Sequence, residues 1–120
     1  MNNNDSRLIR LLLKQTLDGK AAWDDTISSD TYQADLENAI VQSFSYEGNW
    51  DSMHYGIRIL RKTDGVALKT LMSDDPDCDA DDRNTMKRIF ERAREIALNA
   101  DDTINSLLGE LGGGADELLG

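Results

Sequence analysis

The spacing of hydrophobic residues changes twice along this chain, from helical to alternating and then back to helical. Residues 5–18 have the helical spacing, and one of Asn4, Asp5 and Ser6 is expected to cap the helix. Its apolar residues are Leu8, Ile9, Leu11, Leu12, Leu13 and Leu17. Because they cover a wide arc, we expect the helix to contact a sheet and also either a second helix or a second subunit. Burial within one monomer is the preferred interpretation.

Between residues 20 and 72, apolar and polar residues alternate, which is typical of strands with one buried face. The predicted strands are Tyr32–Leu36, Ala39–Tyr46, His54–Lys62 and Val66–Met72, and an edge strand near Ala22–Ile27 that carries Trp23. A two-residue hairpin turn is expected at Asp64-Gly65, because these residues accept the positive φ angles that such turns need. The segments therefore predict an antiparallel meander of four or five strands.

A second helical pattern begins near Asp82, and its hydrophobic stripe continues to residue 111. The stripe consists of Met86, Ile89, Phe90, Ala93, Ile96, Ala97, Ala100, Ile104, Leu107, Leu108 and Leu111. Two interpretations are open: a single helix about 45 Å long, or two helices that meet near Asn99. We prefer the break, because Leu98 departs from the stripe and residues 99–102 resemble a new helix start.

Together these patterns predict a single α+β domain over residues 1–111. It consists of an N-terminal helix, a four- to five-stranded antiparallel meander, and one or two C-terminal helices packed on one face of the sheet. Residues 112–120 begin with three glycines and contain further acids, so we expect a flexible tail there.

The chain is strongly acidic, with 23 Asp and Glu residues against 13 Lys and Arg residues and a formal net charge of −10. Phosphate recognition needs clustered cations, so nucleic acid and anionic lipid are not expected as direct ligands. No apolar run is long enough for a membrane span, and the N-terminal residues lack a signal-peptide pattern. The lone cysteine, Cys78, cannot form an internal disulfide, which favours a cytoplasmic location. Either a basic partner or a halophilic source explains the acidity.

The acidic loop Asp74–Asp82 is the best candidate for a metal site, although its pattern is incomplete. The acids that match the first ligands of a calcium-binding loop are Asp75, Asp77, Asp79 and Asp81. Ala80 replaces the glycine of that motif, and Met86 stands where its bidentate glutamate should be. Capping of the following helix is therefore the preferred interpretation, with weak binding of divalent cations as the alternative.

Groups that carry most enzyme chemistry are few in this sequence. It has one histidine, His54, and Cys78 lies among aspartates, which disfavour a reactive thiolate. A general base also needs a nucleophile and a means of stabilising charge, and the sequence contains no recognisable set. We therefore expect no catalytic activity and no cofactor.

Contact with another protein is the function that remains. Five basic residues lie within Arg83–Arg94 on the solvent side of the second helix, and none follows Arg94. The residues expected to make contacts are Trp50, Arg88, Arg92 and Asp77. The prediction is a small regulator, inhibitor or adaptor that binds a basic protein or associates with itself, for example as a homodimer through the C-terminal helix. Mimicry of nucleic acid by the carboxylates is a further alternative.

Overall fold

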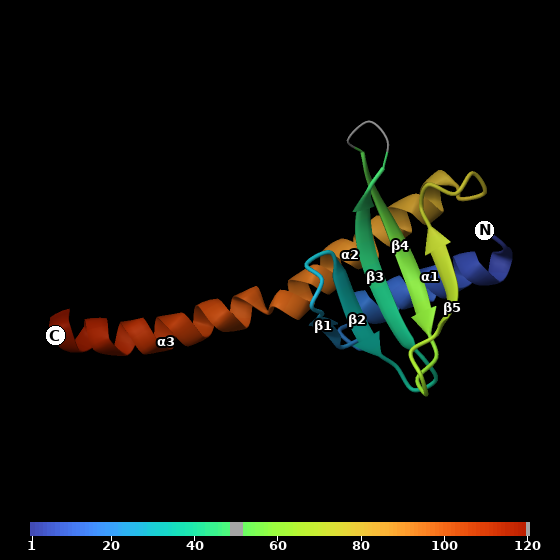
Figure 1. Cartoon of the computed structure of the whole chain (residues 1–120). Coiled ribbons are helices and arrows are strands. Elements are labelled where there is room, and N and C mark those ends of the chain that lie inside the picture. Colours follow the sequence, from blue (N-terminus) through green and yellow to red (C-terminus); the bar gives the residue numbers. More distant parts are fainter. Residues whose placement is uncertain (49–51, 120) are drawn as a thin grey trace.

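A computed structural model describes residues 1–48 and 52–119 of the chain (Figure 1). Within these residues it contains three helices and five strands. Their bounds are α1 Asn3–Leu17, β1 Trp23–Asp25, β2 Thr31–Asp35, β3 Ile40–Glu47, β4 Met53–Leu60, β5 Ala67–Met72, α2 Ala80–Leu98 and α3 Ala100–Leu119. This order of elements confirms the predicted α+β class.

The five strands form one antiparallel sheet in the order β1-β2-β3-β4-β5, which confirms the predicted meander. Neighbouring strands pair in chain order, so that Ala34 lies opposite Val41 and Ser43 lies opposite Ile57. Side chains alternate between the two faces of each strand. Val41 and Ile57 therefore point to the buried face, and Arg58 points to the other.

Helices α1 and α2 cover the same face of the sheet (Figure 1). The core between the helices and the sheet includes Ile9, Leu12, Leu13, Trp23, Tyr32, Ala34, Val41, Ile57, Leu71, Met86, Ile89, Phe90 and Ala93. The hydroxyl of Ser6 on α1 donates to the Asp82 carboxylate on α2 over 2.8 Å, which fixes the two helices at one end. Of the one or two C-terminal helices expected on the sheet, α2 is the one that packs there.

The β4–β5 connection differs from the predicted two-residue turn at Asp64-Gly65. The loop is longer, and it is closed by hydrogen bonds from Arg61 N–H to the Val66 carbonyl (2.9 Å) and from Gly65 N–H to the Arg61 carbonyl (2.8 Å). Of the two turn residues only Gly65 has a positive φ, at 73°. The Asp64 carboxylate instead accepts two hydrogen bonds from the Arg61 guanidinium, which stabilise the longer loop.

The start of α1 also differs from the prediction. Asn2 caps the helix, and its side chain accepts the N–H of Asp5 over 2.8 Å. The three residues expected as caps, Asn4, Asp5 and Ser6, therefore lie inside the first turn.

The C-terminal helical segment is divided into two helices at Asn99, as the sequence favours. Asn99 ends α2 in the left-handed conformation, with φ 52° and ψ 40°. Its carbonyl then accepts the Thr103 N–H at the start of α3, over 2.9 Å. Helix α3 extends away from the sheet and from the other helices (Figure 1). The radius of gyration is 17.7 Å, whereas a compact chain of this length would have about 14 Å, and the projecting helix accounts for the difference.

Helix α3 includes most of the segment expected as a flexible tail, because its backbone is helical as far as Leu119. Glycine inside a helix costs about 1 kcal/mol relative to alanine, so Gly112, Gly113 and Gly114 weaken this end of the helix. The flexibility of the segment stays a prediction. In the described part of the chain, no helix is long and apolar enough to cross a membrane.

Candidate interaction site

Helix α3 presents an apolar stripe that no other element in the described part of the chain covers. Its members follow the spacing i, i+3, i+4 and i+7, and they are Ile104, Leu107, Leu108 and Leu111. These four residues are 46 to 65% exposed. Met86 and Ile89, which begin the same stripe on α2, are 0% exposed. The stripe is continuous in the sequence, but only its α2 half is buried in the core.

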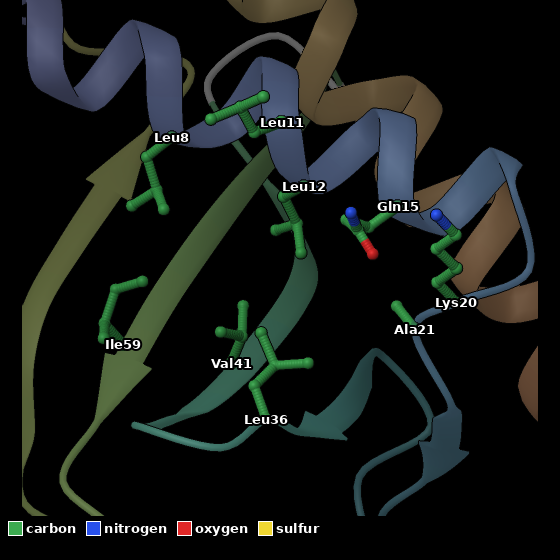
Figure 2. A pocket seen from close by; sticks show the side chains of 9 residues that line it. All are labelled: Leu8, Leu11, Leu12, Gln15, Lys20, Ala21, Leu36, Val41 and Ile59. Atoms are coloured by element: carbon green, nitrogen blue, oxygen red, sulfur yellow. The ribbon is translucent and has the colours of Figure 1, made fainter.

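A groove lies between α1 and the sheet, and Figure 2 shows the side chains that line the smaller of its two parts. Two adjoining hollows of about 250 and 540 Å³ share four apolar lining residues, Leu8, Leu36, Val41 and Ile59. We call the combined hollow the α1 groove; its remaining lining residues are Leu11, Leu12, Gln15, Lys20, Ala21, Glu37, Asn38, Ala39 and Lys69. The lining is mostly apolar, so the α1 groove is suited to apolar side chains.

Helix α1 is only partly buried, which corrects the preferred interpretation that its apolar arc is buried within one monomer. Ile9, Leu12 and Leu13 are buried as expected. Leu8 and Leu11 are 40% and 51% exposed, and both border the groove. The wide apolar arc therefore contacts the sheet and α2 on one side only, and its other side is open.

Cations line the α1 groove or lie on the same helix. Lys20 lines it, and Arg7 and Lys14 lie four residues before and three residues after Leu11 on α1. These three cations are exposed, and none of them forms an ion pair with a described residue. Lys69 differs, because its ammonium group lies 2.7 Å from the Asp5 carboxylate. The groove lining thus contains two cations, Lys20 and Lys69, and one acid, Glu37, while Arg7 and Lys14 add exposed positive charge to α1.

The opposite face of the sheet carries a cluster of polar and aromatic side chains that bond to one another. The Arg58 guanidinium lies over the Phe44 ring, 4.4 Å from its centroid, and donates to the Gln42 side chain over 2.9 Å. Gly56 makes room for the ring, since a Cβ there would come within 2.2 Å of a Phe44 ring atom. Phe44 is consequently only 7% exposed although no helix covers this face.

Tyr46 and His54 lie side by side at one end of this face, with ring centroids 5.4 Å apart. The Tyr46 hydroxyl donates to the Asp74 carboxylate over 2.5 Å. Burial, and next the hydrogen bond and charge of Asp74, raise the pKa of Tyr46 to about 12. His54 Nε2 lies 3.1 Å from the Ser52 hydroxyl, but among the described residues no carboxylate bonds to His54. The arrangement thus lacks, within the described residues, the acid that orients the histidine of a hydrolytic triad.

Two carboxylates of the acidic loop accept backbone N–H groups, and one of them caps α2. Asp79 caps α2 by accepting the Asp82 N–H over 2.8 Å, and Asp75 accepts the Asp77 N–H over 3.0 Å. The described residues contain no group of three or more His, Cys, Asp or Glu side chains arranged to hold a metal ion. The structure therefore supports the capping interpretation for Asp79 and offers no support for a cation site at Asp75, Asp77, Asp79 and Asp81.

Cys78 lies within this loop but belongs to the core, where it is 2% exposed. Burial, and next the negative charge of Asp82, raise the pKa of its thiol. A buried thiol with a raised pKa is a poor nucleophile, because the thiolate is the reactive form.

The structure does not bring the four predicted contact residues together into one site. Trp50 lies outside the described residues. Arg88 and Arg92 are exposed on neighbouring turns of α2, and Arg92 is bonded to Glu95 over 2.7 Å. Asp77 lies in the loop before α2, where its carbonyl accepts the Met1 ammonium group over 2.7 Å.

The α1 groove, with Leu8, Leu11 and Lys20 in its lining, is not evident from the sequence. The excess width of the apolar arc on the first helix is the signal that points to it. No family model, curated protein or solved structure matches this chain. Its function is therefore argued from the geometry of these surfaces.

Proposed function

We propose that this protein works as a non-catalytic regulator or adaptor and that α3 is its docking helix. The observation that carries the proposal is the stripe Ile104, Leu107, Leu108 and Leu111, exposed on a helix that no other described element covers. A run of large apolar residues on one exposed face marks a surface that binds another protein. A helix that lays its i, i+3, i+4 and i+7 residues into an apolar groove is a common form of such binding.

The charge of α3 determines which partners it suits. No Lys or Arg follows Arg94, and Asp102 and Glu110 are exposed on α3. A matching surface is therefore an apolar groove on a protein with positive charge in the surrounding region. Salt screens the charged part of such an interaction, with a Debye length of about 3 Å at 1 M, and leaves the apolar part in place. Binding through α3 should weaken in high salt without being lost.

The composition of α3 fits a helix that is stabilised by its partner. Isolated helices are marginal in water even with favourable residues, because nucleation is costly and tertiary packing supplies most of the stability. Gly109 and Gly112 lower the helical stability of α3 further, and an added Cβ at either position would meet nothing within 4 Å. We infer that contact along the stripe supplies the stability that the helix lacks by itself.

A cytoplasmic location accords with this function. Cys78 is buried and is the only cysteine, so the fold gains nothing from an oxidising compartment. Fractionation of host cells tests the location: recovery in the cytoplasmic fraction supports it, and recovery in an extracellular or membrane fraction contradicts it.

Site-specific photo-crosslinking in the host cell tests the docking helix. A benzophenone amino acid replaces Leu108 in the stripe, and in a matched control it replaces Ser106, which lies on the opposite side of α3. We expect a protein adduct from position 108 and a much weaker one from position 106. Equal adducts from both positions, or no adduct from position 108, would contradict the proposal.

A further inference from the structure

We propose that the partner of α3 is a second copy of this chain, whose α1 groove receives the apolar stripe. This inference rests on the proposed role of α3 as a docking helix and adds the identity of the surface it binds. The two surfaces suit each other in shape. One is a hollow lined mainly by leucine, isoleucine and valine, and the other is a row of leucine and isoleucine that projects from a helix.

The apolar parts match in kind and in exposure. Leu8 and Leu11 on the groove are 40% and 51% exposed, and Leu107 and Leu108 on α3 are 46% and 64% exposed. Docking removes both sets from water at once, at about 25 cal/mol for each Å² of apolar surface buried. The exposed groove and the exposed stripe in a single chain are thus both explained, because each would be covered by the other in a second copy.

The charges match in sign. Lys20 lines the groove, and Arg7 and Lys14 are exposed on α1; none of the three forms an ion pair with a described residue. One acid, Glu37, also lines the groove.

Asp102 and Glu110 are exposed on α3, which carries no cation at all. Both acids lie four residues from Ser106, on the side of α3 away from the stripe. The opposite charges of α3 and α1 therefore favour encounter at long range and do not pair across the contact. Two α3 helices would instead approach each other as two acidic segments, neither of which carries a cation.

The direction of α3 favours a second copy over the chain's own groove. After Asn99 the helix points away from the domain (Figure 1), and its 20 residues extend for about 30 Å. To reach its own groove, α3 would have to reverse its direction at Asn99. Exchange of α3 between two copies fills both grooves and closes the assembly as a symmetric dimer.

Light scattering after gel filtration tests this dimer with single-residue variants. Leu11→Asp places a charge at the groove, Leu108→Asp places one in the stripe, and Ser106→Asp adds the same charge to the opposite side of α3. We expect the unmodified chain and Ser106→Asp to form dimers. Leu11→Asp and Leu108→Asp should each raise the dimer dissociation constant by about a hundredfold or more.

A mixture of the two disrupted variants gives the decisive result. The Leu108→Asp chain keeps an intact groove and the Leu11→Asp chain keeps an intact α3, so the mixture should form a dimer that neither variant forms alone. Its dissociation constant should lie between those of the unmodified chain and of the single variants, because one of the two contacts is intact. Thermal unfolding of each variant checks the fold. Arg7→Glu with Lys14→Glu, both at exposed positions, provides an α1 variant that reverses the charge attraction and leaves the core untouched.

Two outcomes would overturn this inference and have different consequences for the proposed function. If Leu11→Asp and the Arg7/Lys14 variant still form dimers whereas Leu108→Asp does not, α3 pairs with another α3, and its role as a docking helix stands. If the unmodified chain is monomeric at every concentration, the second copy is not the partner, and photo-crosslinking at position 108 decides whether α3 docks on a different protein.

Discussion

Leu11 and Leu12 are neighbours in α1, yet Leu12 is 6% exposed in the core and Leu11 is 51% exposed beside the groove. Leu12→Ala should lower the free energy of unfolding by about 2–5 kcal/mol, because it leaves a cavity among packed side chains. Leu11→Ala should change it by no more than about 0.5 kcal/mol at a concentration where the chain is monomeric. Urea unfolding of both variants measures the difference. Equal losses would show that Leu11 is part of the monomer core.

The indole N–H of Trp23 donates to the Thr16 hydroxyl over 3.0 Å and joins α1 to the edge strand β1. Trp23 is 2% exposed, so its N–H has no water to replace a lost partner. Thr16→Val should therefore lower the free energy of unfolding by about 1–3 kcal/mol, which chemical denaturation measures. Thr16→Ser keeps a hydroxyl and serves as the control. A Thr16→Val variant as stable as Thr16→Ser would contradict the role of this hydrogen bond.

The raised pKa of Tyr46 makes stability depend on pH in the alkaline range. The folded chain holds the Tyr46 proton more tightly than the unfolded chain does, and this difference stabilises the fold. The stabilisation is fully present below pH 10, the ordinary pKa of tyrosine, and is lost as the pH rises through about 12. Absorbance titration should show one tyrosine that ionises after the others, and Tyr46→Phe should remove that step. Asp74→Asn should lower the pKa only part of the way, because burial is the larger cause. An unchanged pKa in Asp74→Asn would exclude the carboxylate as a cause.

Asn99 holds the left-handed conformation between α2 and α3, with φ 52°. Glycine accepts this conformation without cost, whereas alanine is strained by about 1–2 kcal/mol. Asn99→Ala should therefore either lower stability by about that amount or straighten the junction, and Asn99→Gly should do neither. Thermal unfolding measures the first effect, and small-angle X-ray scattering measures the second as a larger radius of gyration. If Asn99→Ala has the stability and shape of Asn99→Gly, the left-handed residue does not define the junction.

Much of the fold could be predicted because each pattern has a local physical cause. Alternation marked the strands, and the irregular position of Leu98 marked the break at Asn99. The β4–β5 turn could not be predicted in detail, because the Arg61–Asp64 ion pair that favours the longer loop depends on the placement of two side chains. The cap at Asn2 was missed because several residues near the start can serve as caps.

The site was harder to predict than the fold. The apolar spacing continues from Met86 to Leu111 on both sides of the helix break, so it gives no sign that only its first half is buried. The groove depends on α1 lying over Leu36, Val41 and Ile59, which are distant in the sequence, so periodicity within α1 indicates the spare apolar surface but not what faces it. The cluster of basic residues predicts contacts at Arg88 and Arg92, but both are exposed on α2 and do not line the α1 groove.

Disulfide crosslinking between two differently labelled chains tests the central claim most directly. In a Cys78→Ala background, one chain carries Leu11→Cys in the groove, and the other carries Leu108→Cys in the stripe or, as the control, Ser106→Cys. Contact between the α1 groove and the α3 stripe of a second copy predicts a mixed dimer of the Leu11→Cys and Leu108→Cys chains, and little product with Ser106→Cys. Crosslinks only between two Leu108→Cys chains, or equal yields from positions 106 and 108, would contradict the account.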